Sequence, residues 1–208
     1  MSRASSRPRS PATLRPFEEI RDRRRGPGLT AEDWADAALW SLEEGVDALS
    51  VERLARKLGV TKGSFYWHYA GRPALLQAAL ARWEQLATEE VIARLEELPT
   101  PQERLQRLLA VTFDPAPAGR LEVAIAAAAA NPLIQPVVAR VSRRRIDYLV
   151  SLYRALGVSA REARAWALQA YSTYVGLLHL TITSPETLRS HRERADYVKH
   201  LARVLMPE

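Results

Sequence analysis

Hydrophobic residues recur every three to four positions along this chain from Thr30 almost to the C-terminus, and no stretch alternates as a half-buried strand would. Turn and capping signals divide the pattern into about nine helices. Three helix starts carry a capping-box sequence, in which an acidic residue follows the capping hydroxyl after three positions: Thr30 to Asp33, Thr100 to Glu103 and Ser159 to Glu162. The sequence therefore predicts an all-α protein.

The pattern also predicts three regions. Residues 1–28 are rich in Ser, Arg and Pro and are expected to form a disordered arm, which is either a solvated leader or a segment that lies in a DNA minor groove. Residues 29–76 read as a small domain of three short helices. Residues 77–208 read as a larger helical domain, which a long helix beginning near Gly71 joins to the first.

The most informative segment is a pair of short helices. One begins after Ser50 and the next after Thr61, and Gly59 lies between them where a left-handed turn residue is required. Helical geometry directs Phe65 and Tyr69 toward the core. It leaves the following residues on the opposite face or its flanks: Lys62, Gly63, Ser64, Tyr66, Trp67 and His68. Hydroxyl, amine and exposed aromatic groups on one short helix favour a surface that contacts the DNA backbone and bases.

The amino-acid composition excludes several other kinds of site and of protein. The chain has 208 residues, no cysteine and only four histidines, so disulfides and thiol catalysis are excluded, and no metal site or cofactor is expected. No apolar run reaches about 18 residues, and the N-terminus lacks the apolar segment of a secretory signal. We therefore expect a cytoplasmic protein without a membrane segment.

The net charge of +6 is unevenly distributed. The arm holds eight Arg and three acidic residues, whereas residues 29–76 hold five basic and seven acidic residues and have a net charge of −2. Attraction to phosphate normally dominates affinity for nucleic acids. Here it must come from individually placed residues or from the arm.

Residues 29–76 resemble the N-terminal domain of the TetR family of transcriptional repressors. The resemblance is carried by the segment from Leu49 to Tyr69 and then by Arg72, Leu75 and Leu76. It implies that the helix after Thr61 enters the major groove, with DNA contacts at Ser50, Thr61, Lys62, Gly63, Tyr66, Trp67 and His68. Arg72 stands where the family usually has a lysine, and it is expected to bind phosphate. Glu52 departs from the family, because many members have a basic residue there; its carboxylate would repel phosphate or accept from a cytosine amine.

The resemblance also implies a homodimer that binds a near-palindromic operator and is released by a small-molecule effector. The dimer would form through helices at about 159–183 and 186–205. Inward-facing candidates for the effector cavity, for each of which ordinary core packing is the competing role, are Trp83, Leu86, Leu105, Leu109, Phe113, Ile125, Trp166, Tyr174 and His179. For Arg143, Arg144 and Arg145 we expect a solvated surface with a pair to Asp147, or one arginine that binds an anionic ligand.

The leading hypothesis is thus a ligand-responsive DNA-binding repressor and not an enzyme, because no nucleophile–base pair, paired carboxylates or phosphate loop is evident. One alternative is an all-helical enzyme or small-molecule carrier, which would need converging polar groups in the cavity. Another is a nonspecific architectural DNA binder that uses the arginine arm. Deleting residues 1–25 would distinguish the last, because a specific regulator would keep its sequence preference.

Overall fold

The computed structural model describes residues 14–23, 28–112, 118–188 and 191–207. Every regular element in these ranges is helical, which confirms the predicted all-α fold. The α-helices are α1 (Phe17–Arg23), α2 (Ala31–Leu42), α3 (Val51–Leu58), α4 (Lys62–Tyr66), α5 (Arg72–Glu84), α6 (Glu90–Glu96), α7 (Pro101–Thr112), α8 (Ala118–Ala127), α9 (Gln135–Ala155), α10 (Ala160–Thr183) and α11 (His191–Val204). Short 3-10 helices are η1 (Val46–Ala48) and η3 (Pro185–Leu188), and η2 (Gln85–Glu89) is a π-helical turn.

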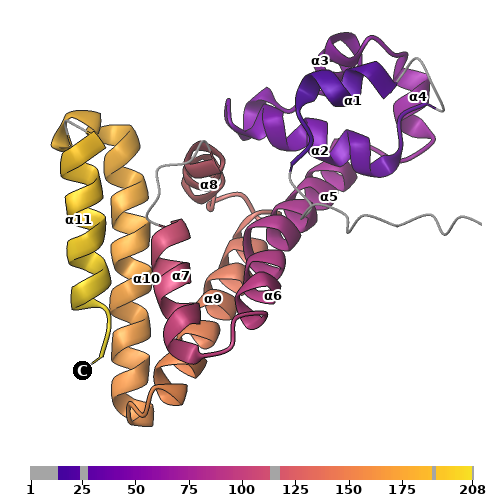
Figure 1. The fold of residues 1–208 in the computed structure, drawn as a ribbon. Coiled ribbons are helices and arrows are strands. Elements are labelled where there is room, and N and C mark those ends of the chain that lie inside the picture. The colour runs from indigo at the N-terminus through magenta and orange to yellow at the C-terminus, as the bar shows by residue number, and fades with distance from the viewer. Residues whose placement is uncertain (1–13, 24–27, 113–117, 189–190, 208) are drawn as a thin grey trace, which may run out of the picture.

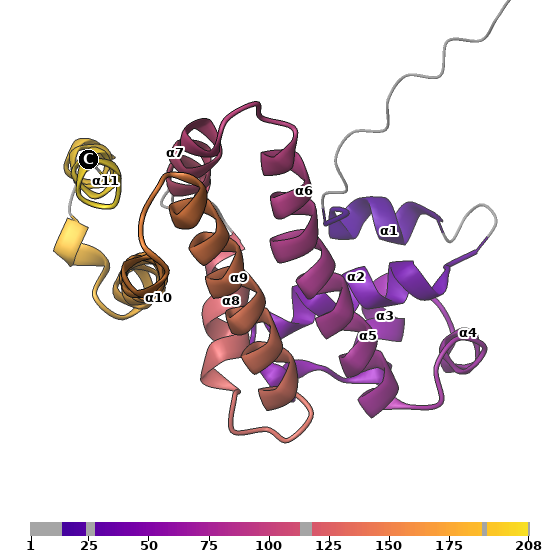
Figure 2. The ribbon, with the colours of Figure 1, turned by 90° about the horizontal axis from the view of Figure 1, so that it is seen from below.

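The molecule is elongated, with α1 to α4 gathered at one end and the α10–α11 pair at the other (Figure 1). The segments α5, η2 and α6 follow one another without a break and, with α9 beside them, connect the two ends (Figures 1 and 2). The small N-terminal cluster is therefore attached to the larger helical body through one long helix.

Two of the three capping boxes predicted from the sequence are complete, and the third forms its bond to the N-cap side chain. The Thr30 backbone N–H donates to the Asp33 carboxylate at 2.8 Å, and the Asp33 N–H donates to the Thr30 hydroxyl at 3.2 Å. Thr100 and Glu103 make the same reciprocal pair, at 3.1 and 3.2 Å. The Glu162 N–H donates to Ser159 Oγ at 3.3 Å. These bonds satisfy backbone donors that a helix start leaves without a partner, and so they set where α2, α7 and α10 begin.

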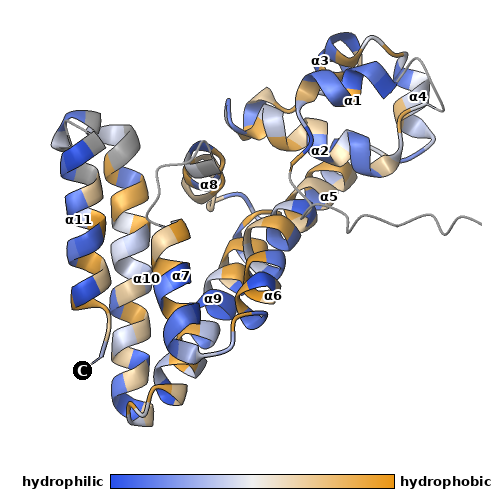
Figure 3. Ribbon diagram, viewed as in Figure 1, coloured by the Kyte–Doolittle hydropathy of each residue, from blue (hydrophilic) through white to orange (hydrophobic). Residues whose placement is uncertain are grey.

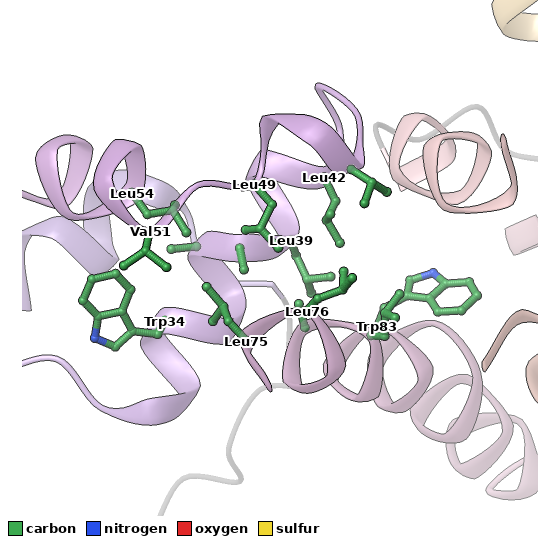
Figure 4. Close-up of a cluster of buried hydrophobic side chains, with 14 of the residues drawn as sticks. Trp34, Leu39, Leu42, Leu49, Val51, Leu54, Leu75, Leu76 and Trp83 are labelled. Atoms are coloured by element: carbon green, nitrogen blue, oxygen red, sulfur yellow. The ribbon is translucent and has the colours of Figure 1, made fainter. Parts of the chain in front are cut away.

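The first hydrophobic core does not stop at the boundary predicted between residues 76 and 77. Figure 4 shows Trp34 at one end of this cluster and Trp83, two turns beyond Leu76 on the same helix, at the other. The cluster continues through Leu121 and Ile125 of α8 to Val141 of α9. Because α5 carries apolar residues along its whole length, it belongs to the N-terminal cluster and to the larger body at once, and a core that follows it joins the two.

The prediction of a disordered arm over residues 1–28 was wrong for part of its length. Within residues 14–23 the chain forms α1, whose Ile20 is fully buried. Arg15 pairs with the fully buried carboxylates of Asp33 at 2.6 Å and Asp36 at 2.9 Å. The two acidic residues of α2 provide the physical reason for this order, since they attract Arg15 and leave it less free for DNA. Residues 1–13 and 24–27 lie outside the described residues.

The π-helical turn η2 changes which residues face inward. The sequence predicted continuous α-periodicity through Leu86, Ala87 and Val91, but these side chains are only half-buried. The buried positions run instead from Trp83 to Thr88, five residues apart, and then to Ile92. The wider turn of a π-helix accommodates this extra residue, and so the inward face of α6 is displaced by one position from that of α5.

A second core fills the larger body between α6, α7, α9, α10 and α11. Its C-terminal side is held by Tyr153, whose hydroxyl donates to the Leu205 carbonyl at 2.8 Å. The last helix, predicted at about 186–205, is divided into η3 and α11. Among the helices of the described ranges, none has the length and apolar character needed to cross a bilayer.

Candidate nucleic-acid interface and internal cavity

A tight turn sets α4 at an angle to α3. Gly59 adopts the left-handed conformation, with φ 69° and ψ 35°, which costs a glycine little because it has no Cβ. The Val60 N–H then returns to the Ala55 carbonyl at 3.0 Å and ends α3. Ser50 caps α3 and Thr61 caps α4, each through its side-chain oxygen. This arrangement is a helix-turn-helix.

The two faces of α4 separate as the sequence predicted. Phe65 is fully buried and packs edge-on against Trp34, with ring centroids 5.4 Å apart. Tyr69 stacks on Phe65 and donates its hydroxyl to the Ala31 carbonyl at 2.7 Å. On the other side Trp67 is 88% exposed and Tyr66 is 60% exposed. Two large aromatic groups therefore stand in solvent beside a well-packed core.

Glu52 links two of the predicted DNA contacts. Its carboxylate pairs with Lys62 Nζ at 2.8 Å and accepts a hydrogen bond from the Ser50 hydroxyl at 3.1 Å. Hydrogen bonding from Lys62, then from the backbone and Ser50, together with the Lys62 charge, lowers the pKa of Glu52 to about 2. Glu52 therefore stays ionised at neutral pH and partly neutralises the only basic side chain of α4.

Two other predicted DNA contacts are used within the domain. The His68 ring Nε2 lies 2.9 Å from the Leu29 carbonyl. Arg72 donates to the carbonyls of Leu49 at 2.7 Å and Val46 at 2.8 Å. Arg72 thus secures the connection that precedes α3, which is a positioning role that the resemblance did not indicate. Thr61 and Gly63 are exposed and Ser64 is half-buried.

The larger body contains a cavity of about 590 Å³. Most of its lining is apolar and comes from η2, α6, α7, α9 and α10. One part of the wall is polar, where Arg145 of α9 pairs with Glu122 of α8. Arg145 also donates to the Thr88 hydroxyl at 2.9 Å and the Ala87 carbonyl at 3.2 Å, both in η2.

The aromatic residues around this pair complete its surroundings. Trp83 donates its indole N–H to Glu122 at 3.0 Å, and the Arg145 guanidinium lies 5.5 Å from the Trp83 ring and 6.0 Å from the Tyr174 ring. Burial alone would lower the pKa of Arg145, but the Glu122 carboxylate outweighs it and raises that pKa. Burial, and then the Glu122 charge, also raises the pKa of Tyr174. Both side chains therefore keep their protons throughout the neutral range.

Of the predicted cavity residues, Leu86, Leu109 and Tyr174 do line the cavity. Trp83 reaches it only through Glu122, and Leu105 is fully buried in the second core. The remaining candidates lie elsewhere: Ile125 is fully buried in the first core, Trp166 packs against Tyr153, and His179 is exposed. Phe113 lies outside the described residues. Helical spacing identifies inward faces, but it does not distinguish a filled core from a cavity.

The sequence analysis missed the two charged residues of the cavity. Arg145 belongs to the basic run 143–145, for which a solvated surface was the safer interpretation, and Arg144 pairs with Glu89 at 3.1 Å rather than with Asp147. The available signal was Glu122, a lone carboxylate within the apolar, alanine-rich stretch 118–130. Among the described residues, no three acidic or histidine side chains converge in a way that would hold a metal ion.

A helix-turn-helix with an exposed aromatic face, attached to a larger helical body, is the arrangement of a DNA-binding regulator. Residues 36–79 match the model of the bacterial regulatory proteins of the tetR family. The match identifies the helix-turn-helix domain as similar to the DNA-binding domain of that family, and it covers about a fifth of the chain.

Individual relatives agree with this assignment. The HTH-type transcriptional regulator SrpR of Pseudomonas putida is 47% identical over 47 residues, which is 22% of this chain and 22% of that protein. The chain thus spans about a fifth of the length of this curated relative. The reduced form of E. coli NemR superposes with a TM-score of 0.68 at 18% identity over 86% of this chain and 99% of NemR.

A further solved structure is the transcriptional regulator FadR from Bacillus subtilis in complex with stearoyl-CoA. It superposes with a TM-score of 0.62 at 13% identity, over 85% of this chain and 97% of FadR. At these identities the two superpositions show a shared fold and nothing further.

Proposed function

We propose that this protein is a sequence-specific, DNA-binding transcriptional repressor of the cytoplasm that a small molecule releases from a near-palindromic operator. The observation that carries the proposal is Trp67, which is 88% exposed on the outer face of α4 while Phe65, two residues earlier, is fully buried. Tyr66 beside it is 60% exposed, so two adjacent aromatic rings form an apolar patch on this helix. On the second helix of a helix-turn-helix, such a patch faces the major groove of DNA.

The proposed reading surface consists of Ser50, Thr61, Lys62, Gly63, Ser64, Tyr66 and Trp67. Hydroxyl and amine groups of this set would bind phosphate and fix the register, and the two aromatic rings would contact thymine methyl groups or sugars. We assign His68 and Arg72 to positioning, because both hold backbone carbonyls of the domain itself.

A homodimer through α10 and α11 is the second part of the proposal. Both helices expose large apolar side chains, namely Leu168, Val175 and Leu180 on α10 and Tyr197 and Val204 on α11. Figure 3 shows that α10 is the more hydrophobic of the two, with α11 on its outer side. Two copies joined there would present two recognition helices separated by roughly 34 Å or more, and a near-palindromic operator follows from that symmetry.

The cavity is the proposed effector site. Its volume of about 590 Å³ falls within the range of sites for small organic ligands. The FadR complex with stearoyl-CoA supports the proposal, because it has a ligand on a similar fold. An all-helical enzyme or carrier is not favoured, since the polar groups in the cavity pair with one another and neither a nucleophile nor a general base stands ready.

Binding to DNA from the promoter of the gene that encodes this protein tests the proposal. In fluorescence anisotropy titrations at low salt, Trp67→Ala is expected to lose operator affinity by about tenfold or more, since a buried aromatic contact contributes about 1–3 kcal/mol. Trp67→Phe, which keeps an aromatic ring, should lose less. Arg154→Ala, an exposed change on α9, should lose nothing. Wild-type protein that binds no palindromic promoter fragment would refute the proposed function.

A further inference from the structure

The two charges in the polar part of the cavity wall, on Arg145 and Glu122, neutralise each other. Arg145 and Glu122 pair directly, and their side chains are only 13% and 15% exposed. Both carboxylate oxygens have donors, since one accepts from Arg145 and the other from Trp83. A cation and an anion at this depth therefore neutralise each other without a ligand.

Such a pair penalises a ligand that brings a net charge. A third charge at the same depth would lose its hydration and find no counter-ion, and burial of an unpaired charge is among the costliest events in a protein interior. Apart from this pair, the buried and half-buried lining carries no charge and is mainly aliphatic, as at Leu86, Ile92 and Leu149, so it supplies no counter-ion. The other charged lining residues, Arg94, Glu97 and Arg107, are exposed and stay hydrated.

An uncharged polar group, by contrast, finds partners there. A guanidinium has five N–H donors, and Arg145 directs them to three acceptors, in Thr88, Ala87 and Glu122. A ligand hydroxyl or carbonyl that lies against this pair can accept from the guanidinium or donate to the carboxylate. The apolar part of the ligand would then fill the rest of the cavity.

We infer that the cavity selects electrically neutral amphiphiles, which are mainly apolar molecules with one hydroxyl or carbonyl head directed at the Arg145–Glu122 pair. The inference rests on the proposed function, in which this cavity holds the effector. It differs from the expectation that one arginine of the run 143–145 binds an anionic ligand, because the Glu122 carboxylate already pairs with Arg145.

Three probes of equal chain length test the inference. 1-Decanol, decanoate and decylammonium share a ten-carbon chain, and their head groups are neutral, anionic and cationic at pH 7. In calorimetric titrations of the full chain, 1-decanol is expected to bind about tenfold or more tightly than either ion, because each ion leaves one charge unpaired. An ion that binds as tightly as 1-decanol would overturn the inference, and so would 1-decanol that does not bind at all.

Charge-removing variants should then invert the selection. Glu122→Gln leaves Arg145 unpaired and is expected to favour decanoate, whereas Arg145→Met leaves Glu122 unpaired and is expected to favour decylammonium. Glu97→Gln and Arg107→Met remove the same charges from exposed lining positions, so these matched controls should keep the preference for 1-decanol. A variant with an intact circular dichroism spectrum and an unchanged preference counts against the inference.

If Glu122→Gln or Arg145→Met fails to fold, the comparison of the three probes on the wild-type protein still tests the inference about the cavity. Operator binding is measured on the same preparations without any probe. A chain that binds DNA but shows no preference among the probes contradicts only the inference about the cavity. A chain that binds no DNA contradicts the proposed function, whatever the probes show.

Discussion

Glu52 reduces the positive charge of the proposed reading surface, because its carboxylate pairs with Lys62 and accepts a hydrogen bond from Ser50 in the free protein. A carboxylate at the edge of a DNA-binding surface repels phosphate whatever the base sequence. At the same time it holds Lys62 in one place. Such a residue lowers affinity for all DNA, so contacts with the bases contribute a larger fraction of the binding free energy.

Glu52→Gln is therefore expected to raise affinity for unrelated DNA by about two- to fivefold at low salt and to steepen the dependence of log K on log salt by about one. Affinity for the operator should rise less, so the ratio of specific to nonspecific binding falls. Anisotropy titrations at several salt concentrations measure both quantities. Glu44→Gln, which removes an exposed carboxylate paired with Arg53 and Lys57 in the same domain, is the matched control.

The effect of Glu52→Gln should not depend on pH in the working range. The folded-state pKa of Glu52 is lowered to about 2 from an ordinary value of 4.5, so its ion pair is complete above about pH 4.5 and is lost only as the pH falls toward 2. The ratio of the DNA affinity of Glu52→Gln to that of the wild-type protein should accordingly be constant from pH 6 to pH 8. A ratio that changes across this range would show that another group controls Lys62.

Arg15 shows how one residue gives order to a segment of weak helical pattern. It lies between Asp33 and Asp36, both fully buried, and Arg82 of α5 approaches Asp36 from the other side at 2.8 Å. Among the described residues, Arg15→Met leaves Asp33 with the more distant Arg23, at 3.4 Å, as its remaining ion-pair partner, and it is expected to lower the free energy of unfolding by about 3 kcal/mol. Urea denaturation measures this. Arg21→Met, on the exposed side of α1, should change stability by no more than about 0.5 kcal/mol.

At the scale of elements, η2 connects the cavity to the DNA-binding domain. It follows directly on α5, which is clamped to α2 by Arg82 and Asp36, and it receives two hydrogen bonds from Arg145 at the cavity wall. Arg82 thus attaches α5 to the N-terminal domain, whereas Glu84 at the end of α5 pairs with Arg140 of α9 at 2.6 Å. The π-helical turn, which Arg145 binds at Ala87 and Thr88, is therefore attached to α9 directly beyond the contact between α5 and α2.

Thr88→Val tests how firmly Arg145 holds this turn. The change keeps the shape of the side chain but removes the acceptor of the Arg145 Nε–H, at a cost of about 1–2 kcal/mol in unfolding free energy. Hydrogen exchange over residues 85–90 should accelerate. Thr112→Val is the control, because the Thr112 hydroxyl bonds only to carbonyls of its own helix. Equal protection of η2 in wild type and Thr88→Val would mean that packing alone maintains the turn.

At the scale of the whole molecule, the exposed apolar residues of α10 and α11 stand at the end opposite α3 and α4 (Figure 1). A dimer through this end would set the distance between the two reading surfaces through the length of α5, η2 and α6. A change in any of these segments would then alter the spacing of the recognition helices. The operator, which has a fixed spacing, would be bound less tightly.

Val175→Glu is expected to produce monomers and to weaken operator binding by about tenfold or more, because an unpaired charge at the centre of an apolar interface opposes association. Sedimentation velocity measures the oligomeric state. Val111→Glu places the same charge at another exposed valine, on α7, and should leave the sedimentation coefficient unchanged. A Val175→Glu protein that sediments like the wild type would place the dimer contact elsewhere.

Local signals sufficed for much of the fold. The capping boxes at Thr30, Thr100 and Ser159 predicted helix starts, and Gly59 predicted the turn between α3 and α4, because each depends on the residue itself and its close neighbours. Spacing along α4 likewise separated buried Phe65 from exposed Trp67. Order in α1 could not be predicted, because it depends on carboxylates about twenty residues further along the chain.

By itself the sequence determined the all-helical architecture, the helix-turn-helix and the side of α4 that faces water, since helical periodicity and turn chemistry act within a few residues. Only the tertiary structure decided that Arg72 and His68 hold the domain together, that Lys62 is paired with Glu52, and that Arg145 and Glu122 meet in a cavity. Each of these pairs joins residues from different helices or connections. A charge distant in sequence has no effect on local pattern, although in the folded chain it decides which charged side chains are paired.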